Sequence, residues 1–268
     1  MIAKMLRARQ SAASAAPAAP QARRLPRHVR AYAIGDVHGR LDLLDQMLGA
    51  IRQDIAARKK AQNHIVMLGD LIDRGPQSRE VVERLMTFKA LDIELHLLSG
   101  NHEEVLIRLL DGDASLIPDW LRFGGAETLA SYGVDVQGLR DCAPRDARRR
   151  IRAAIPADHL AFLRSFADTV RIGDYLFVHA GIRPKVELAD QSQVDFRWIR
   201  EPFLSDETEH GFVVVHGHTI TDQIIERPNR IGIDTGAYAT GRLTALGLED
   251  DSRWVVEAIE APAAARLI

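Results

Sequence analysis

Apolar and polar positions follow two different periods along the first third of the chain. Short apolar runs that end in Gly or Ser predict three strands, at residues 31–35, 64–69 and 93–99. After each strand, apolar residues recur at helical spacing, which predicts helices at residues 41–57, 79–88 and 103–110. Strands that alternate with helices in this way predict βαβ units and a largely parallel, buried sheet.

The second half of the chain returns to closely spaced apolar runs. They predict five more strands, at residues 175–179, 212–216, 230–234, 243–248 and 254–259. Few helical segments separate these strands, so we expect mostly antiparallel pairing in this half. Residues 111–168 give no strand signal, and their Arg, Asp and Ala content favours a helical insertion. The expected fold class is α/β, as one domain with a helical insert.

The first residues have a composition of their own. Residues 1–28 are rich in Ala, Pro and Arg, and no acidic residue occurs before Asp36. We interpret them as a disordered leader, because Ala-Pro tracts bury too little surface to become ordered. An organelle presequence is the alternative, and the absence of a compact apolar segment argues against a secretory signal. The folded domain is then expected at residues 29–268.

Composition and charge narrow the possible partners of this 268-residue chain. The formal net charge of −2 and the pI near 6.6 give no electrostatic reason to expect nucleic acid or an anionic membrane. Cys142 is the single cysteine, which excludes an intramolecular disulfide and a thiolate metal cage and favours a cytoplasmic location. No segment approaches the ~18 apolar residues of a membrane span.

Polar residues that can bind metals follow apolar strands at five places. These places are Gly35-Asp-Val-His-Gly39, Gly69-Asp-Leu-Ile-Asp-Arg-Gly-Pro76, Gly100-Asn-His-Glu103, His179-Ala-Gly181 and His216-Gly-His-Thr219. Asp36, Asp70 and Asn101 lie 34 and 31 positions apart, about the length of one βαβ unit, so their loops should meet at one sheet edge. Taken singly, Asp36 is equally typical of a helix N-cap, and His179 of a core histidine. The coincidence at five strand ends favours a shared set of ligands.

The residue types indicate which metals this set would bind. Carboxylates, imidazoles and one amide oxygen, without a thiolate, suit Mn, Fe or Zn. Two cations ~3.5–4 Å apart repel each other and need a shared anion, which Asp70 in the middle loop would provide. Asp36 and His38 would reach the first cation. The second cation would be held by Asn101, His179 and His218.

These motifs resemble those of the calcineurin-like metallophosphoesterases, and within them the phosphoprotein-phosphatase branch of bacterial and phage serine/threonine phosphatases. The resemblance runs from about Val29 to Leu248 and includes Ile233-Asp-Thr-Gly-Ala237. It implies a four-layer αββα sandwich with mixed sheets. The symmetrical dinucleoside tetraphosphatases carry similar motifs, so the resemblance separates the two activities poorly.

The resemblance also implies a role for individual residues. Asp36, His38 and Asp70 would bind one metal, and Asp70, Asn101, His179 and His218 the other. The shared Gly-His-Thr sequence selects His218 over His216, which becomes a supporting or structural residue. His102 would be the general acid and Asp73 would orient it. Arg74 and a second arginine would bind the substrate phosphate, with Arg200 as the better match and Arg197 as its rival.

The expected function is hydrolysis of phosphomonoesters, most of all phosphoserine or phosphothreonine in proteins. Two divalent cations, Mn in the first place and Fe or Zn as alternatives, would lower the pKa of a bridging water toward ~7, and the resulting hydroxide would attack phosphorus. Protonation of the leaving alkoxide by His102 would contribute ~10²–10⁴-fold. Two alternatives stay open, a symmetrical dinucleoside tetraphosphate hydrolase and a non-catalytic metal-binding interaction module.

Several of these residues also have a plainer interpretation. Asp73 and Arg74 could pair with each other on the surface, and Arg200 could belong to a turn before Pro202. Glu103 is expected to cap the helix that follows Asn101 rather than to touch a metal. The insert around residues 120–132 is either a lid or wall of the substrate cleft or a small structural subdomain.

Overall fold

The computed structural model describes residues 23–261 of the chain. Most of the expected leader, residues 1–22, lies outside the described residues. Residues 23–28 pack against the domain: Leu25 is buried, and its backbone N–H donates to the carbonyl oxygen of Asp250 at 2.8 Å. The boundary expected at Val29 therefore lies inside the packed part of the chain.

The first sheet has the predicted βαβ arrangement. Its strands follow the order β10-β9-β1-β2-β3, with β1 at Val29–Ile34, β2 at Gln62–Met67, β3 at Ile93–Leu97, β9 at Arg242–Glu249 and β10 at Ser252–Ile259. β1 pairs with β2 and β2 with β3 in parallel, and β9 and β10 add antiparallel strands beyond β1. The connecting helices are α1 (Leu41–Ala57) and α2 (Ser78–Met86), and α3 (Asn101–Asp111) follows β3.

The second sheet corrects the expectation of antiparallel pairing for three of the five strands predicted in the second half of the chain, whereas the other two, β9 and β10, are antiparallel as expected. Its order is β4-β5-β6-β8-β7, with β4 at Thr169–Ile172, β5 at Tyr175–Val178, β6 at Val213–His216, β7 at Ile225–Glu226 and β8 at Arg230–Gly232. β5, β6 and β8 are parallel, because a long connection between β5 and β6 returns the chain to the same end. This connection contains η3 (Leu188–Asp190), α9 (Gln193–Trp198) and η4 (Phe203–Ser205). The short edge strands β4 and β7 were not among the predicted strands.

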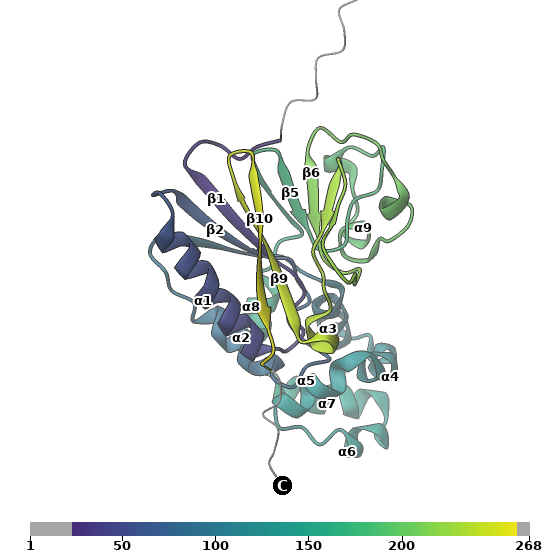
Figure 1. Cartoon of the computed structure of the whole chain (residues 1–268). Helices are drawn as coiled ribbons and strands as arrows, with labels where there is room; N and C mark the ends of the chain where they lie inside the picture. Colours follow the sequence, from purple (N-terminus) through teal and green to yellow (C-terminus); the bar gives the residue numbers. More distant parts are fainter. Residues whose placement is uncertain (1–22, 262–268) are drawn as a thin grey trace, which may run out of the picture.

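The two sheets pack face to face between layers of helices. Ala33 and Val66 of the first sheet share one buried cluster with Phe177 and Val215 of the second. Helices α1 and α2 cover the outer face of the first sheet, and α9 with η4 covers that of the second (Figure 1). This arrangement confirms the α/β class and the four-layer αββα sandwich.

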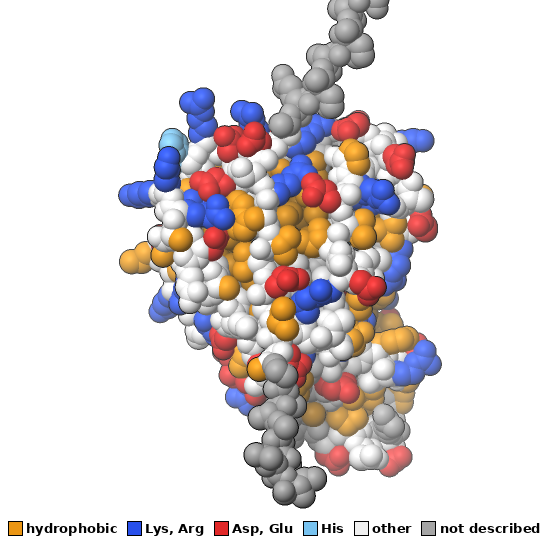
Figure 2. Space-filling view, in the orientation of Figure 1, with side chains coloured by type: hydrophobic (Ala, Val, Ile, Leu, Met, Phe, Trp, Pro, Cys, Tyr) orange, Lys and Arg blue, Asp and Glu red, His pale blue; other side chains and the backbone are white. Residues whose placement is uncertain are grey.

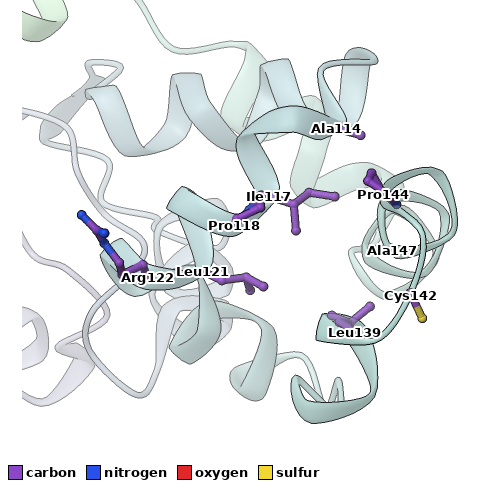
Figure 3. Close-up of a pocket in the computed structure, with 9 residues that line it drawn as sticks. All are labelled: Ala114, Ile117, Pro118, Leu121, Arg122, Leu139, Cys142, Pro144 and Ala147. Atoms are coloured by element: carbon purple, nitrogen blue, oxygen red, sulfur yellow. The ribbon is translucent and has the colours of Figure 1, made fainter.

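The chain between α3 and β4 consists of short helices. They are η1 (Ala114–Leu116), α4 (Ile117–Trp120), a π-helical turn η2 (Leu121–Gly125), α5 (Ala126–Ser131), α6 (Gln137–Arg140), α7 (Pro144–Ala154) and α8 (Ala157–Arg164). Helices α4 to α7 lie beyond the end of the sheets in Figure 1. Ile117, Leu121 and Leu139 point into an apolar cavity of about 490 Å³ among these helices (Figure 3).

The surface in Figure 2 carries both signs of charge. Lys and Arg side chains are interspersed with Asp and Glu over this face, in agreement with the formal net charge of −2. Within residues 23–261, none of the helices combines the length and the apolar character needed to cross a bilayer.

Candidate metal centre

The ends of six parallel strands supply the polar residues of one site. β1, β2 and β3 lead into the loops of Asp36, Asp70 and Asn101, as their spacing along the chain predicts. β5, β6 and β8 lead into three further loops, which carry His179, His218 and Asp234. Because parallel strands deliver their carboxyl ends to one edge, each sheet contributes three loops to the same place.

Asp70 lies at the centre of this group. Its Oδ2 atom lies 3.4 Å from Nε2 of His179, 3.6 Å from Nε2 of His38 and 3.9 Å from Nε2 of His102. Burial raises the pKa of the Asp70 carboxyl, but the imidazoles of His179, His102 and His38 together lower it below its ordinary value. The Asp70 carboxylate is therefore ionised and shared between histidines of both sheets.

His179 and His218 meet Asn101 across the two sheets. Nε2 of His179 lies 3.0 Å from Oδ1 of Asn101 and 3.2 Å from Nδ1 of His218. Nδ1 of His179 faces the carbonyl oxygen of Leu68 at 2.9 Å, and Nδ1 of His38 faces that of Ile72 at 2.8 Å. A backbone acceptor at Nδ1 selects the tautomer that leaves Nε2 with a free lone pair, as metal-binding histidines require.

Asp36 lies beside a second buried carboxyl, that of Asp234, which belongs to the Ile233-Asp-Thr-Gly-Ala237 motif. Both oxygens of Asp36 accept from the backbone N–H of His218, at 3.1 and 3.3 Å. Burial, followed by the charges of Asp234 and Asp70, raises the pKa of Asp36 well above its ordinary value. Burial also raises the pKa of Asp234, to about 6. Neighbouring cations would relieve this repulsion between buried carboxylates.

Glu103 holds the Asp70 loop in place. Its carboxylate accepts backbone N–H bonds from Asp70, Leu71 and Gly100, at 2.9, 2.8 and 2.9 Å. The bond to Gly100 is that of an N-terminal helix cap, which confirms the role expected for Glu103. Burial and then the charge of Asp70 raise the pKa of Glu103 to about 7.

His102 and Asp73 form a buried pair next to this group. Nδ1 of His102 donates to Oδ2 of Asp73 at 2.7 Å, and Asp73 is fully buried. The surface pair of Asp73 with Arg74, given above as an alternative, is therefore wrong. Burial lowers the pKa of His102, but the charges of Asp70 and Asp73 outweigh it and raise this pKa to about 9. At neutral pH the His102 imidazole thus carries a proton that it can donate.

Two residues of the helical insert fix the orientation of Asp73. Nε1 of Trp120 donates to Oδ2 of Asp73 at 3.0 Å, and the Thr128 hydroxyl donates to Oδ1 at 2.6 Å. The sequence offered no signal for either contact, because both residues are distant from Asp73 along the chain. The insert is therefore part of the site's support.

The arginines expected to bind phosphate differ in their surroundings. Nη2 of Arg74 lies 3.2 Å from Nε2 of His102, and its guanidinium lies 4.6 Å from the ring centre of Tyr238. Arg200 lines the same cavity as Arg74 and His102. Arg197 is bound instead to Asp168, at 2.6 Å, and to Glu104. The local contacts thus favour Arg200 over Arg197 as a group that faces the cavity.

His216 lies apart from the ligand group. Its ring makes an edge contact with Phe203, and Nδ1 faces the carbonyl oxygen of Gly217 at 3.1 Å. Burial lowers the pKa of His216 to about 4, so the ring is neutral in the core. Its packing is that of the structural histidine expected from the sequence.

The backbone of the site is held in an uncommon conformation. Among the described residues, eight non-glycine residues have positive φ. Five of them lie in the site: His38, Asp70, Asp73, Arg74 and His218, with φ between 45° and 72°. Such conformations cost free energy and persist where the surrounding structure enforces them, which is typical of functional sites.

The donor groups fit a pair of divalent cations. Burial lowers the pKa of His38 and of His218 to about 3, so both imidazoles are neutral, the form that binds metals. Nδ1 of His218 is the ring nitrogen that faces the ligand group, because it lies 3.2 Å from Nε2 of His179. His38, Asp70 and His102 form one group of possible ligand atoms, and Asp70, His179 and His218 form another. The two groups share the Asp70 carboxylate, as a pair of cations requires.

A cavity of about 410 Å³ opens directly onto these groups. Its floor contains Asp70, Asn101, His102 and His218, and its polar wall contains Arg74 and Arg200. Leu116, Trp120 and Phe123 of the insert form another wall. Of the two interpretations of the insert, the wall of a cleft is therefore the one that describes its position.

A third histidine group, on β2 and β3, lies outside this cavity. Nδ1 of His64 and Nε2 of His96 are 3.0 Å apart, with Glu94 beside them. One imidazole donates to the other, so this pair is satisfied without a metal.

Comparison with known proteins places the chain in a family. The family model for calcineurin-like phosphoesterases matches residues 29–245. A symmetrical bis(5'-nucleosyl)-tetraphosphatase of Janthinobacterium sp. is 26% identical over 82% of this chain and 93% of that protein, and an asymmetrical one of Bacillus velezensis is 29% identical over 84% and 91%. A crystal structure of a putative diadenosine tetraphosphatase has a TM-score of 0.61 at 20% identity, with 88% and 100% covered. The chain belongs to the calcineurin-like phosphoesterase family.

Proposed function

We propose that the protein hydrolyses dinucleoside tetraphosphates, with two divalent cations bound at the candidate metal centre. The observation that carries this proposal is the similarity to bis(5'-nucleosyl)-tetraphosphatases over more than four fifths of the chain and more than nine tenths of those relatives. Serine/threonine phosphatase activity, the leading expectation above, becomes the second candidate, and the dinucleoside tetraphosphatase activity that the family resemblance gave as an alternative takes first place.

Six residues would hold the cations. Asp36, His38 and Asp70 would bind one, and Asp70 with Asn101, His179 and His218 the other. When bound, such cations would supply Lewis acidity and would lower the pKa of water, so that a nucleophile is available at neutral pH. Arg74 and Arg200 would bind phosphate oxygens at the wall of the same cavity, where guanidinium donors match phosphate geometry.

His102 would protonate the leaving group, and its importance depends on that group. The phosphate leaving group of an anhydride is weakly basic and departs readily without a proton. A serine or threonine alkoxide is strongly basic and needs one. The His102–Asp73 pair, with the pKa of His102 raised to about 9, favours phosphoserine or phosphothreonine hydrolysis as the second candidate function.

Turnover of the two substrate classes separates these candidates. Purified protein with added Mn²⁺ should hydrolyse diadenosine tetraphosphate with a kcat/KM well above that for a phosphoserine peptide. A preference for the phosphopeptide would overturn the proposal and support the second candidate. No turnover of either substrate, nor of p-nitrophenyl phosphate, would support a non-catalytic binding module.

The His102→Asn variant tests the proton donor within the same panel. It should retain its metal and lose ~10²–10⁴-fold on the phosphoserine peptide, with a much smaller loss on diadenosine tetraphosphate. Metal content measured by elemental analysis is the control. An equal loss on both substrates would contradict the role of His102 as a proton donor to a basic leaving group.

A further inference from the structure

Two large aromatic side chains stand partly exposed at the cavity that opens onto the metal centre. Phe123 retains 52% of its accessible surface and Trp198 retains 37%, and both line this cavity. Phe123 comes from η2 of the insert and Trp198 from the end of α9, so two distant segments place them there. Exposed apolar surface that gathers at a cavity is typical of a ligand-binding site.

Both rings are held in position by polar contacts at their edges or faces. Nε1 of Trp198 donates to Oε2 of Glu104 at 3.1 Å, and the guanidinium of Arg122 lies 4.8 Å from the ring centre of Phe123. Gly124, next to Phe123, accepts the backbone N–H of Arg74 at 3.1 Å. The backbone next to Phe123 is therefore hydrogen-bonded to the segment that carries Arg74, one of the two arginines proposed to bind phosphate.

Gly124 explains why this connection is rigid. Its φ is +115°, and a Cβ atom at this position would lie 2.4 Å from the backbone nitrogen of Arg74. A glycine is needed for the two backbones to approach so closely. The close approach therefore fixes the backbone of Phe123–Gly124 against the backbone of Arg74.

We propose that Phe123 and Trp198 form a nucleobase subsite beside the phosphate-binding part of the cavity. The inference rests on the proposed function and specifies how its substrate is recognised. Every nucleobase has an aromatic face that can stack on a phenylalanine or tryptophan ring, so this contact does not depend on which base is bound. The phosphate of the same nucleotide then reaches Arg74, Arg200 and the metal centre. The volume of about 410 Å³ lies within the range of small-ligand sites and suits one nucleotide unit.

The test compares a ligand that has a base with one that has none. AMP and inorganic phosphate are measured as competitive inhibitors of p-nitrophenyl phosphate hydrolysis by the full-length, Mn²⁺-loaded protein. Each stacking contact is expected to be worth about ten- to a hundredfold in affinity. Wild-type protein should therefore bind AMP more tightly than phosphate by about tenfold or more. Phe123→Ala and Trp198→Ala should each remove most of this difference.

Conservative variants separate stacking from a structural role. Phe123→Tyr and Trp198→Phe keep an aromatic face and should restore AMP binding, whereas Phe123→Leu keeps only apolar bulk and should not. Leu91→Ala removes a fully exposed apolar side chain elsewhere and serves as the matched control. Restoration by Phe123→Leu would overturn the stacking subsite, as would an equal loss of phosphate and AMP binding in the alanine variants.

The outcome is independent of the substrate test above. If diadenosine tetraphosphate is not hydrolysed but AMP inhibition depends on the two rings, the proposed function fails and the subsite stands. If diadenosine tetraphosphate is hydrolysed but AMP binds no better than phosphate, the subsite fails and the proposed function stands.

Discussion

Individual residues of the site hold their positions because particular neighbours lack a side chain. A Cβ atom at Gly100 would lie 2.1 Å from Oδ1 of Asp70, and one at Gly217 would lie 2.1 Å from Oδ1 of Asp36. The two carboxylates occupy space that any other residue would fill. Combined with the positive φ of Asp70 and His218, this close packing fixes the direction of each ligand before a cation arrives.

The Gly100→Ala variant tests this close packing. The added methyl group should displace the Asp70 carboxylate and reduce metal affinity by about 10- to 100-fold or more, the range seen when support of a ligand is lost. The φ of Gly100 is −88°, which alanine adopts readily, but the Cβ would also lie 2.5 Å from the backbone nitrogen of Asp70, so the backbone of the Asp70 loop has to shift together with the carboxylate. Isothermal titration with Mn²⁺ measures the affinity.

Gly49→Ala is the matched control for this variant. Gly49 lies within α1, and a Cβ atom there meets nothing within 4 Å. This variant should bind Mn²⁺ as the wild type does and gain ~0.5–1 kcal/mol of stability from its helical position. Equal Mn²⁺ affinity in Gly100→Ala and in the wild type would show that Mn²⁺ binding does not require the space beside Gly100 that the Asp70 carboxylate occupies.

The sequence was sufficient to predict which polar residues come together at the site. It was not sufficient to predict the neighbouring residues that hold them in place. Asp36, Asp70 and Asn101 stood out because each follows a strand at βαβ spacing. Asp234 follows β8 in the same way, and that signal could have found it. Tyr238, which lies against Arg74, has no comparable signal, because aromatic residues in short helices occur throughout protein cores.

Elements of the fold differ in how well local periodicity encodes them. α1 and the strands β1 to β3 were predicted because amphipathic helices and buried strands repeat with distinct periods. The parallel direction of β5, β6 and β8 depends on the path of a long connection that has little regular pattern of its own. The contacts of the insert with Asp73 are tertiary and leave no trace in local sequence.

The Trp120→Phe variant tests the role of the insert in catalysis. It keeps a ring beside Gly125 but removes the N–H that donates to Asp73. The Asp73 carboxylate should then hold His102 less firmly, and kcat for a phosphoserine peptide should fall by about tenfold. The alkaline limb of the pH–rate profile should change with it, because the contact acts through the His102–Asp73 pair.

The metal content of Trp120→Phe should be unchanged, because the hydrogen bond of Trp120 goes to Asp73, which is not a proposed metal ligand. Full activity in this variant, with an unchanged pH profile, would mean that Thr128 alone positions Asp73. A loss of metal would instead indicate a general structural defect.

The stability of the whole molecule should depend on pH when cations are absent, because buried groups of the site have shifted pKa values. Burial, and then the charge of Asp70, raise the pKa of Glu103 from 4.5 to about 7. Burial lowers the pKa of His102, but the charges of Asp70 and Asp73 outweigh this effect and raise the pKa from 6.5 to about 9. A raised pKa means that the folded state keeps a proton that the unfolded chain has lost. This contribution to stability disappears as pH rises through the folded pKa.

With a chelator present, the free energy of unfolding should therefore fall as pH rises from about 7.5 to about 9, where the folded state keeps the proton of His102 that the unfolded chain has lost. The contribution of Glu103 is lost at lower pH, between 4.5 and about 7. His38, His218 and His216, whose pKa values burial lowers, are neutral in the folded state and have also lost their protons in the unfolded chain above about pH 7.5, one unit above the ordinary pKa, so they do not oppose this trend there. Urea unfolding at several pH values measures it. His102→Asn should flatten the upper part of the dependence, and stability that is constant or rises over this range would contradict the assignment.

The strand order determines when the first sheet and the proposed metal centre can form during synthesis of the chain. A ribosome produces the loops of Asp36, Asp70 and Asn101 early, but His179 and His218 emerge only after most of the chain has been made. β1 must also wait for β9, its antiparallel neighbour, which is among the last strands to appear. Between residues 101 and 179 a nascent chain therefore carries four of the six proposed metal ligands and an incomplete first sheet, and the proposed second cation can be held in full only after His179 and His218 have been made.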